Sequence, residues 1–150
     1  MRIPSLRHFK RSERGSVILE TALMIVLLLV LLFGIVDVGR VLYTANNAVS
    51  AAREGARRAA VQQNIMTSAG VDAVKDTVIN HFSAYRFGGA VLIRDSIDVE
   101  TLPAGVSPPS AVRVTVNYPF TWITPIPRLV GWGNTNTRAV HGQAQYKYEF

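Results

Sequence analysis

One carboxylate stands inside a long apolar run near the N-terminus. Glu20 is the only ionisable residue between Arg14 and Asp37, and the residues from Thr21 to Val36 carry no charge. A charge at the centre of a membrane-inserted helix costs about 2.5–3.5 kcal/mol, and less near the interface. Glu20 is therefore expected either to reach the headgroups from about one turn inside the membrane or to be kept for a partner charge.

A partner charge for Glu20 would arise if the chain were cut between Gly15 and Ser16. The cut would free an α-amine on Ser16, one helical turn before Glu20 in the sequence. An amine and a carboxylate that meet in a low dielectric each relieve the other's desolvation. Spacing alone leaves both explanations of Glu20 open.

The other reactive side chains do not form a recognisable catalytic motif. The three histidines fall in the basic tail, the second expected helix and the last expected strand, at His8, His81 and His141. Asp95, Asp98 and Glu100 lack the glycine-containing loop of a calcium site, which favours a solvated strand edge. No HExxH, Walker or dinucleotide motif occurs, and the absence of cysteine excludes disulfides, thiol chemistry and cysteine-ligated zinc. We therefore expect no enzyme, no cofactor, no metal and no small-molecule substrate.

The element that holds Glu20 is expected to span a membrane. A helix over residues 16–36 would be about 31 Å long, which matches the hydrocarbon core of a bilayer. A helix that is apolar all round normally lies in lipid. The run is longer than the ~7–15 apolar residues of a cleaved secretory signal, and no good cleavage site follows it, so that alternative is disfavoured.

The positive charge is concentrated before this helix. The chain has a formal net charge of +6, and residues 1–15 hold five basic residues against one acidic residue. A basic tail could bind nucleic acid, but a basic tail directly before a spanning helix is more simply an orientation signal. We expect a cytoplasmic leader at 1–15, no nucleic-acid partner, and residues 37–150 on the other side of the membrane.

The helix is expected to continue outside the membrane over residues 37–62, because this stretch is rich in alanine and lacks proline. Its small residues recur every three or four positions, which would let a second helix or a sheet approach closely. They are Ala45, Ala48, Ala52, Gly55, Ala56 and Ala59. Glu54 and Arg58 are spaced for an ion pair, and Asp37 with Arg40 is expected to be an interfacial anchor pair.

Residues 63–150 are expected to form a small α+β head. Apolar residues from Val71 to Tyr85 repeat at helical spacing, with Thr67 or Ser68 as the cap. Alternation predicts strands over 91–100, with a bulge near Asp95, over 112–120 and over 140–148. Pro119 places the end of the second strand at an edge or terminus. The whole fold is expected to be a long helix whose second half packs on one short helix and a roughly three-stranded antiparallel sheet.

Large apolar side chains occur in the proline- and glycine-rich stretch 121–134. Trp122 and Trp132 either form an exposed contact patch, for a partner subunit or the membrane surface, or close the bottom of a small core. Both alternatives are open at this point.

The N-terminal pattern resembles that of a type IV prepilin. The resemblance rests on the basic tail, Gly15, the five-residue step to Glu20 and the long apolar helix. It implies that a prepilin peptidase cuts between Gly15 and Ser16. It also implies that Glu20 then meets the N-terminal amine of a neighbouring subunit.

Two later segments narrow the resemblance to the TadE-like pseudopilins of Tad (tight adherence, Flp-type) pilus systems. Residues 34–40 (GIVDVGR) and 51–57 (AAREGAR) resemble segments of that family, and residues 114–120 (VTVNYPF) resemble its C-terminal strand more weakly. Two features depart from the family pattern. Position 21 is Thr21, where related chains usually have an aromatic residue, and the Leu-Pro step common in their apolar run is missing.

The resemblance implies a pilin-like fold and a pseudopilin or minor pilin in a bacterial inner membrane. The N-terminus would be cytoplasmic, the head periplasmic or extracellular, and the partners would be lipid, the peptidase and other pilin-like subunits. Whether such a subunit enters the fibre or only assists assembly stays open. One alternative is an uncleaved signal-anchored protein that binds an envelope partner through Trp122 and Trp132. A second is a membrane-tethered enzyme, for which the sequence offers no site.

Overall fold

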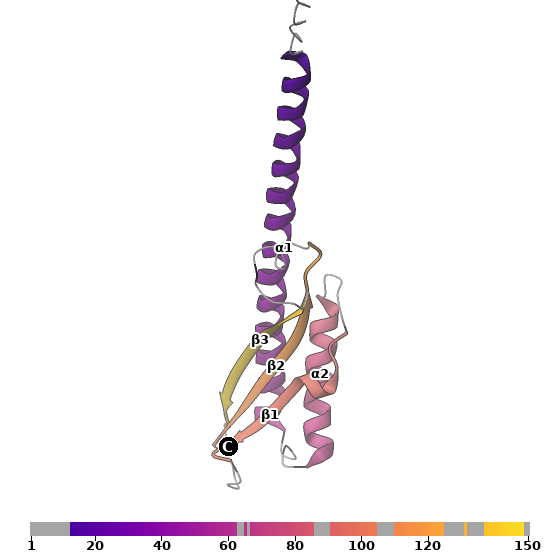
Figure 1. Cartoon of the computed structure of the whole chain (residues 1–150). Helices are drawn as coiled ribbons and strands as arrows, with labels where there is room; N and C mark the ends of the chain where they lie inside the picture. The colour runs from indigo at the N-terminus through magenta and orange to yellow at the C-terminus, as the bar shows by residue number, and fades with distance from the viewer. Residues whose placement is uncertain are drawn as a thin grey trace, which may run out of the picture.

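A computed structural model of the chain describes residues 13–62, 65, 67–85, 91–104, 110–124, 131 and 137–148. The elements, in order, are helices α1 (Glu13–Val61) and α2 (Ser68–Ala84), the 3-10 turn η1 (Arg94–Ser96), and strands β1 (Ile97–Leu102), β2 (Ala111–Thr121) and β3 (Thr137–Lys147). The fold is α+β: the lower half of α1 packs with α2 against one three-stranded sheet (Figure 1). The expected fold class is confirmed.

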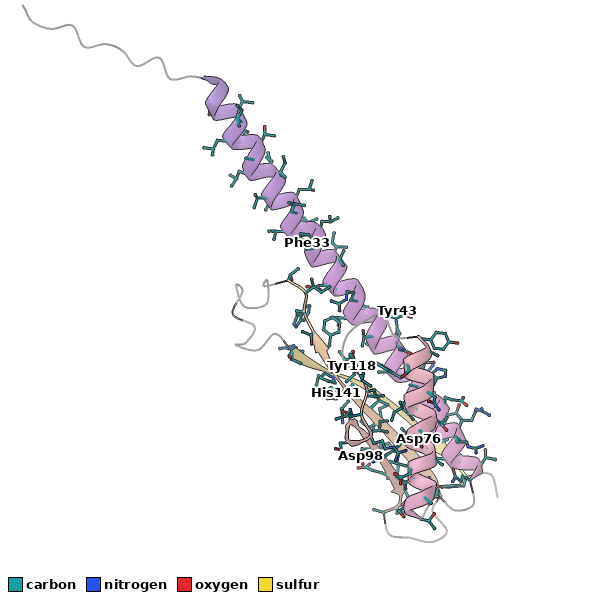
Figure 2. All side chains as sticks on the ribbon, turned by 90° about the vertical axis from the view of Figure 1, so that its right-hand side faces the viewer. Phe33, Tyr43, Asp76, Asp98, Tyr118 and His141 are labelled. Carbon is teal, nitrogen blue, oxygen red and sulfur yellow. The ribbon has the colours of Figure 1, made fainter. Side chains whose placement is uncertain are left out.

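Helix α1 is continuous over 49 residues. It begins at Glu13, three residues before the expected start, and ends at Val61, one residue before the expected end. No proline interrupts it, and the alanines of its second half favour helix. Figure 2 shows Phe33 on the part of α1 that stands clear of the head, and Tyr43 beside the end of α2.

The sheet has the order β1-β2-β3, and both pairings are antiparallel. Strand β2 is therefore central, and alternate side chains from Val112 to Phe120 face the helices and are buried. Pro119 lies beyond Val116, the last β2 residue that pairs with β1. At Pro119 the strand has a neighbour only in β3, so the expected edge position exists locally although β2 is not an edge strand.

The prediction of a strand over residues 91–100 is wrong for the first half of that range. Residues Arg94–Ser96 form the turn η1, with the Ser96 N–H donating to the Ile93 carbonyl at 3.0 Å, and the strand runs from Ile97 to Leu102. Arg94 donates three hydrogen bonds to Asp76 on α2, two to Oδ1 at 2.6 and 3.0 Å and one to Oδ2 at 2.8 Å. The backbone therefore turns beside α2 before it enters the sheet.

The core lies between the helices and the inner face of the sheet. Helix α2 begins as expected, since the Gly70 N–H donates to the Thr67 hydroxyl at 3.1 Å. Val78 and Phe82 on its buried face reach the sheet, and the rings of Phe82 and Tyr118 lie 4.9 Å apart. Helix α1 contributes mainly alanines to the core, so its backbone lies close to β2 and β3.

Candidate functional site

The small residues of α1 face the chain's own head. The side chains of Ala48, Ala52, Ala56 and Ala59 are fully buried, Gly55 is buried, and Ala45 is partly buried. A Cβ added at Gly55 would collide with the Val78 side chain, and one added at Gly142 would collide with the backbone of Ala48. The stripe therefore serves a close contact within the chain, where α1 meets α2 and β3.

The opposite face of this part of α1 is polar. Glu54 accepts hydrogen bonds from Arg57 at 2.7 and 3.0 Å, so the expected pairing of Glu54 with Arg58 is wrong by one position. The hydrogen bonds from the Arg57 guanidinium hold the pKa of the Glu54 carboxyl below its usual range. Residues three and four apart both lie within reach on a helix, and the fork of Arg57 makes the bidentate contact.

The upper half of α1 has no head against it. The large apolar side chains from Val17 to Val36 are exposed by 44% or more. Helix α1 is long and apolar enough to cross a membrane, by length and composition. An apolar surface of this extent is stable in lipid or against other apolar surfaces, and not in water.

Glu20 lies on this bare surface and is exposed. No hydrogen bond or ion pair joins it to any side chain that the structure describes. The neighbouring Thr21 hydroxyl donates to the Val17 carbonyl of the same helix at 2.8 Å, so its hydrogen bond is made within α1. The next acidic residue, Asp37, is about 25 Å along the helix axis.

Gly15 and Ser16 lie in the first turns of α1 and are exposed. A Cβ built on Gly15 would meet nothing within 4 Å. A larger side chain at position 15 is therefore compatible with the fold of this chain.

A buried carboxylate joins α1 to the end of β2. Asp37 is 2% exposed and accepts hydrogen bonds from the Thr124 hydroxyl at 2.6 Å and from the N–H groups of Thr124 and Ile123 at 3.0 and 3.3 Å. Arg40 donates to the same carboxylate at 3.2 Å. These four contacts form the Asp37 clamp, which fixes the end of β2 to the point where the apolar run of α1 ends.

The electrostatics of the clamp favour the ionised carboxylate. Burial raises the pKa of Asp37, but the hydrogen bonds from Thr124, Ile123 and Arg40 outweigh it and hold the pKa below its ordinary value. Asp37 and Arg40 form the expected ion pair, and both also contact the head. Asp37 lies under the head, and the Arg40 guanidinium lies 5.0 Å from the centre of the Phe120 ring.

The aromatic stretch after β2 is only partly described. Trp122 is half-buried and its ring meets that of Phe120 edge-on, with centroids 5.4 Å apart. Ile123 beside it is 67% exposed. Trp132 lies outside the described residues.

The histidines and acids considered for chemistry are dispersed. His81 contacts the Ser50 hydroxyl at 3.0 Å, and His141 contacts the Asn117 side chain at 2.6 Å. Within the described ranges no group of three or more histidine and acidic side chains is arranged to hold a metal ion. An open depression of about 260 Å³ between α1 and α2 is lined by Tyr43, Asn46, Asn47, Ser50, His81 and Tyr85.

Fold and surface together define the class: an α+β head on a helix that is apolar and bare over its first half. Residues 15–57, from Gly15 through most of α1, match the model of a family described as TadE-like protein. The expected resemblance to the TadE-like family is confirmed over these residues. No curated protein and no solved structure matches the chain.

The clamp is the feature that sequence reasoning missed. Its partners are 86 and 87 residues apart, so no local periodicity connects them. The available signal was an acidic residue placed directly after a spanning segment, since such a charge needs shielding or a partner.

Proposed function

We propose that this protein is a pseudopilin or minor pilin of a Tad-type pilus or secretion system. It is made with a basic cytoplasmic leader, anchored by residues 16–36 in the bacterial inner membrane, and carries its head on the periplasmic or extracellular side. The observation that carries the proposal is the bare apolar half of α1, where Glu20 has no partner among the described side chains, within a segment that matches the TadE-like family model from Gly15 onward.

The proposed assembly step rests on the Glu20 carboxylate. A prepilin peptidase would cut between Gly15 and Ser16 and create an amine near Glu20. Because both groups lie at the cytoplasmic end of the helix, the amine of one subunit can meet the Glu20 carboxylate of the next in lipid. Each charge then offsets the other's desolvation, and the pair fixes the register between two helices.

The head supports the same role through packing. Its core is used to hold α1, so that the first half of the helix stays bare for contacts outside the chain. The function proposed for the chain is therefore assembly, with the helix as the working surface.

Processing is the first test. Coexpression with the prepilin peptidase of its own system should give a chain whose intact mass and N-terminal residue correspond to a start at Ser16. Without the peptidase the chain should start at Met1.

Two glycine variants make the processing test specific. A Cβ at Gly15 or at Gly39 meets nothing within 4 Å, so Gly15→Leu and Gly39→Leu are matched in their effect on the fold. We expect Gly15→Leu to remain uncut and Gly39→Leu to start at Ser16. A wild-type chain that keeps Met1 beside an active peptidase would favour the uncleaved signal-anchored protein instead.

A further inference from the structure

The uncharged surface of α1 is longer than a membrane core. After Glu20 the helix has only two charged residues before Arg53, and these are Asp37 and Arg40. Their side chains are 3% and 15% exposed, because both turn into the head. The helix therefore presents almost no charge to its surroundings between residues 21 and 52, about 48 Å, whereas a hydrocarbon core is about 30 Å thick.

The Asp37 clamp fixes the depth of the end of β2. If residues 16–36 span the core, the far surface of the core lies at Asp37. If Glu20 stays at the near surface, about 20 residues cross the core and the far surface moves to the region of Arg40. In both placements Ile123, whose N–H is bound to Asp37, lies at this boundary or just inside it.

Exposed apolar side chains surround the helix at this level. Val38, Leu42 and Tyr43 on α1 are 55%, 60% and 45% exposed, and Ile123 is 67% exposed. We call these four residues the collar. Leu42 is about 9 Å beyond Val36 along the axis, so the collar extends through the layer of lipid headgroups, about 5–8 Å thick on each side.

The chemistry of the collar suits that layer. Aliphatic side chains and tyrosine are typical anchors where a helix leaves the membrane. Arg138, which is exposed and pairs in register with Phe120 near the start of β3, brings a cation to the same end of the sheet. A guanidinium there is suited to lipid phosphate.

We propose that the collar lies in the headgroup layer of the bilayer, so that the head rests directly on the membrane with the end of β2 immersed. Thr124 and Ile123 then shield the Asp37 carboxylate from lipid. The occupant is lipid because the collar continues the bare surface of α1 without a break. This inference rests on the membrane anchoring in the proposed function and adds a second contact, made by the head.

The test uses single cysteines, since the natural chain has none. Ile123→Cys, Ile93→Cys and Leu27→Cys in the full chain each carry a nitroxide, in vesicles of phosphatidylcholine and phosphatidylglycerol. Ile93 is the matched control: it is 56% exposed and lies next to Arg94, which binds Asp76 in the lower part of the head (Figure 2). Collision rates with dissolved oxygen and with a water-soluble nickel chelate report depth.

We expect the label at position 123 to favour oxygen over the chelate severalfold relative to position 93, and position 27 to favour oxygen most. A label at 123 that is as open to the chelate as one at 93 would overturn the inference, while a lipid-buried label at 27 would leave the anchoring intact. A label at 27 that is open to the chelate would overturn the anchoring as well. The label at 123 could also lose its protection from the chelate when the protein is diluted in lipid. That result would assign the collar to a contact with a second copy and overturn the lipid contact.

Discussion

At the scale of single residues, two carboxylates on helix α1 have opposite surroundings. Glu20 is exposed on an apolar surface with no partner among the described side chains, whereas Asp37 is buried and accepts four hydrogen bonds. A buried carboxylate with this many donors stabilises the contact between its partners, because desolvation is compensated. An unpartnered carboxylate in lipid has no such compensation within its own chain.

Replacing Asp37 with alanine should loosen the head from the helix. The change leaves the N–H groups of Ile123 and Thr124 and the Arg40 guanidinium without their acceptor. We expect a loss of on the order of 3 kcal/mol in unfolding free energy. Thermal unfolding of the full chain in detergent measures it. Asp95→Ala, at an exposed carboxylate, is the control and should change stability by less than about 0.5 kcal/mol.

The same clamp predicts a dependence on pH. The folded pKa of Asp37 lies below its ordinary value of 3.8, so the unfolded state takes up a proton first as the pH falls. The stabilisation is fully present above the unfolded pKa and is lost as the pH falls through the folded one. When unfolding is measured at decreasing pH, the unfolding free energy should therefore fall less in Asp37→Ala than in the natural chain. Equal losses in both would contradict this assignment.

At the scale of elements, the sequence predicted the helices and strands that depend on local residue spacing. The spacing of apolar residues gave α2 with its Thr67 cap, and alternation gave β2 and β3 to within a few residues. The turn at Arg94–Ser96 was not predictable in this way, since its contact with Asp76 joins it to another element, distant in the sequence. The partners of Asp37 and the close approach at Gly142 likewise depend on the tertiary arrangement.

The contact of β3 with α1 depends on a glycine. A methyl group at Gly142 would overlap the backbone of Ala48, which cannot move aside without displacing the helix. We expect Gly142→Ala to cost about 1–3 kcal/mol in unfolding free energy, measured by thermal or chemical unfolding. Gly39→Ala, with open space around the added methyl, should leave stability equal or slightly higher, since alanine favours helix over glycine. Equal stability of the two variants would mean that β3 does not rest on α1 so closely.

At the scale of the whole molecule, the two halves of helix α1 have different surroundings. The lower half is covered by the chain's own head, and the upper half is bare and apolar, a surface that suits lipid or another apolar surface. The local residue pattern of a sequence can predict such a division when a continuous helix changes from apolar all round to a single small-residue stripe. It cannot give the depth at which the head meets the membrane, since that depth is set by the clamp.

Substitution of Glu20 tests assembly at this scale. Glu20→Ala should be cut normally at Gly15, because the peptide bond and its flanking residues are unchanged. Loss of one partner of an amine–carboxylate pair in a low dielectric costs about 3–5 kcal/mol, so incorporation or fibre yield should fall tenfold or more. Crosslinking between subunits and electron microscopy of sheared fibres measure the effect.

A control at a carboxylate of the head makes that result interpretable. Asp98→Ala, at an exposed position of β1, should leave both cleavage and assembly unchanged. Normal assembly of the Glu20→Ala chain would remove the register role of Glu20. Failure of both variants would point to a general loss of the protein instead.

The way in which β2 and β3 lie along α1 has a mechanical consequence. The contacts between sheet and helix include the Asp37 clamp and, lower down, Ala48 beside Gly142, and they lie roughly along the helix axis in Figure 1. A pull on the upper part of α1 along that axis would load these contacts in shear, so that many must break together. A sideways pull would open them one after another from the clamp. The head is therefore built to resist axial tension better than peeling.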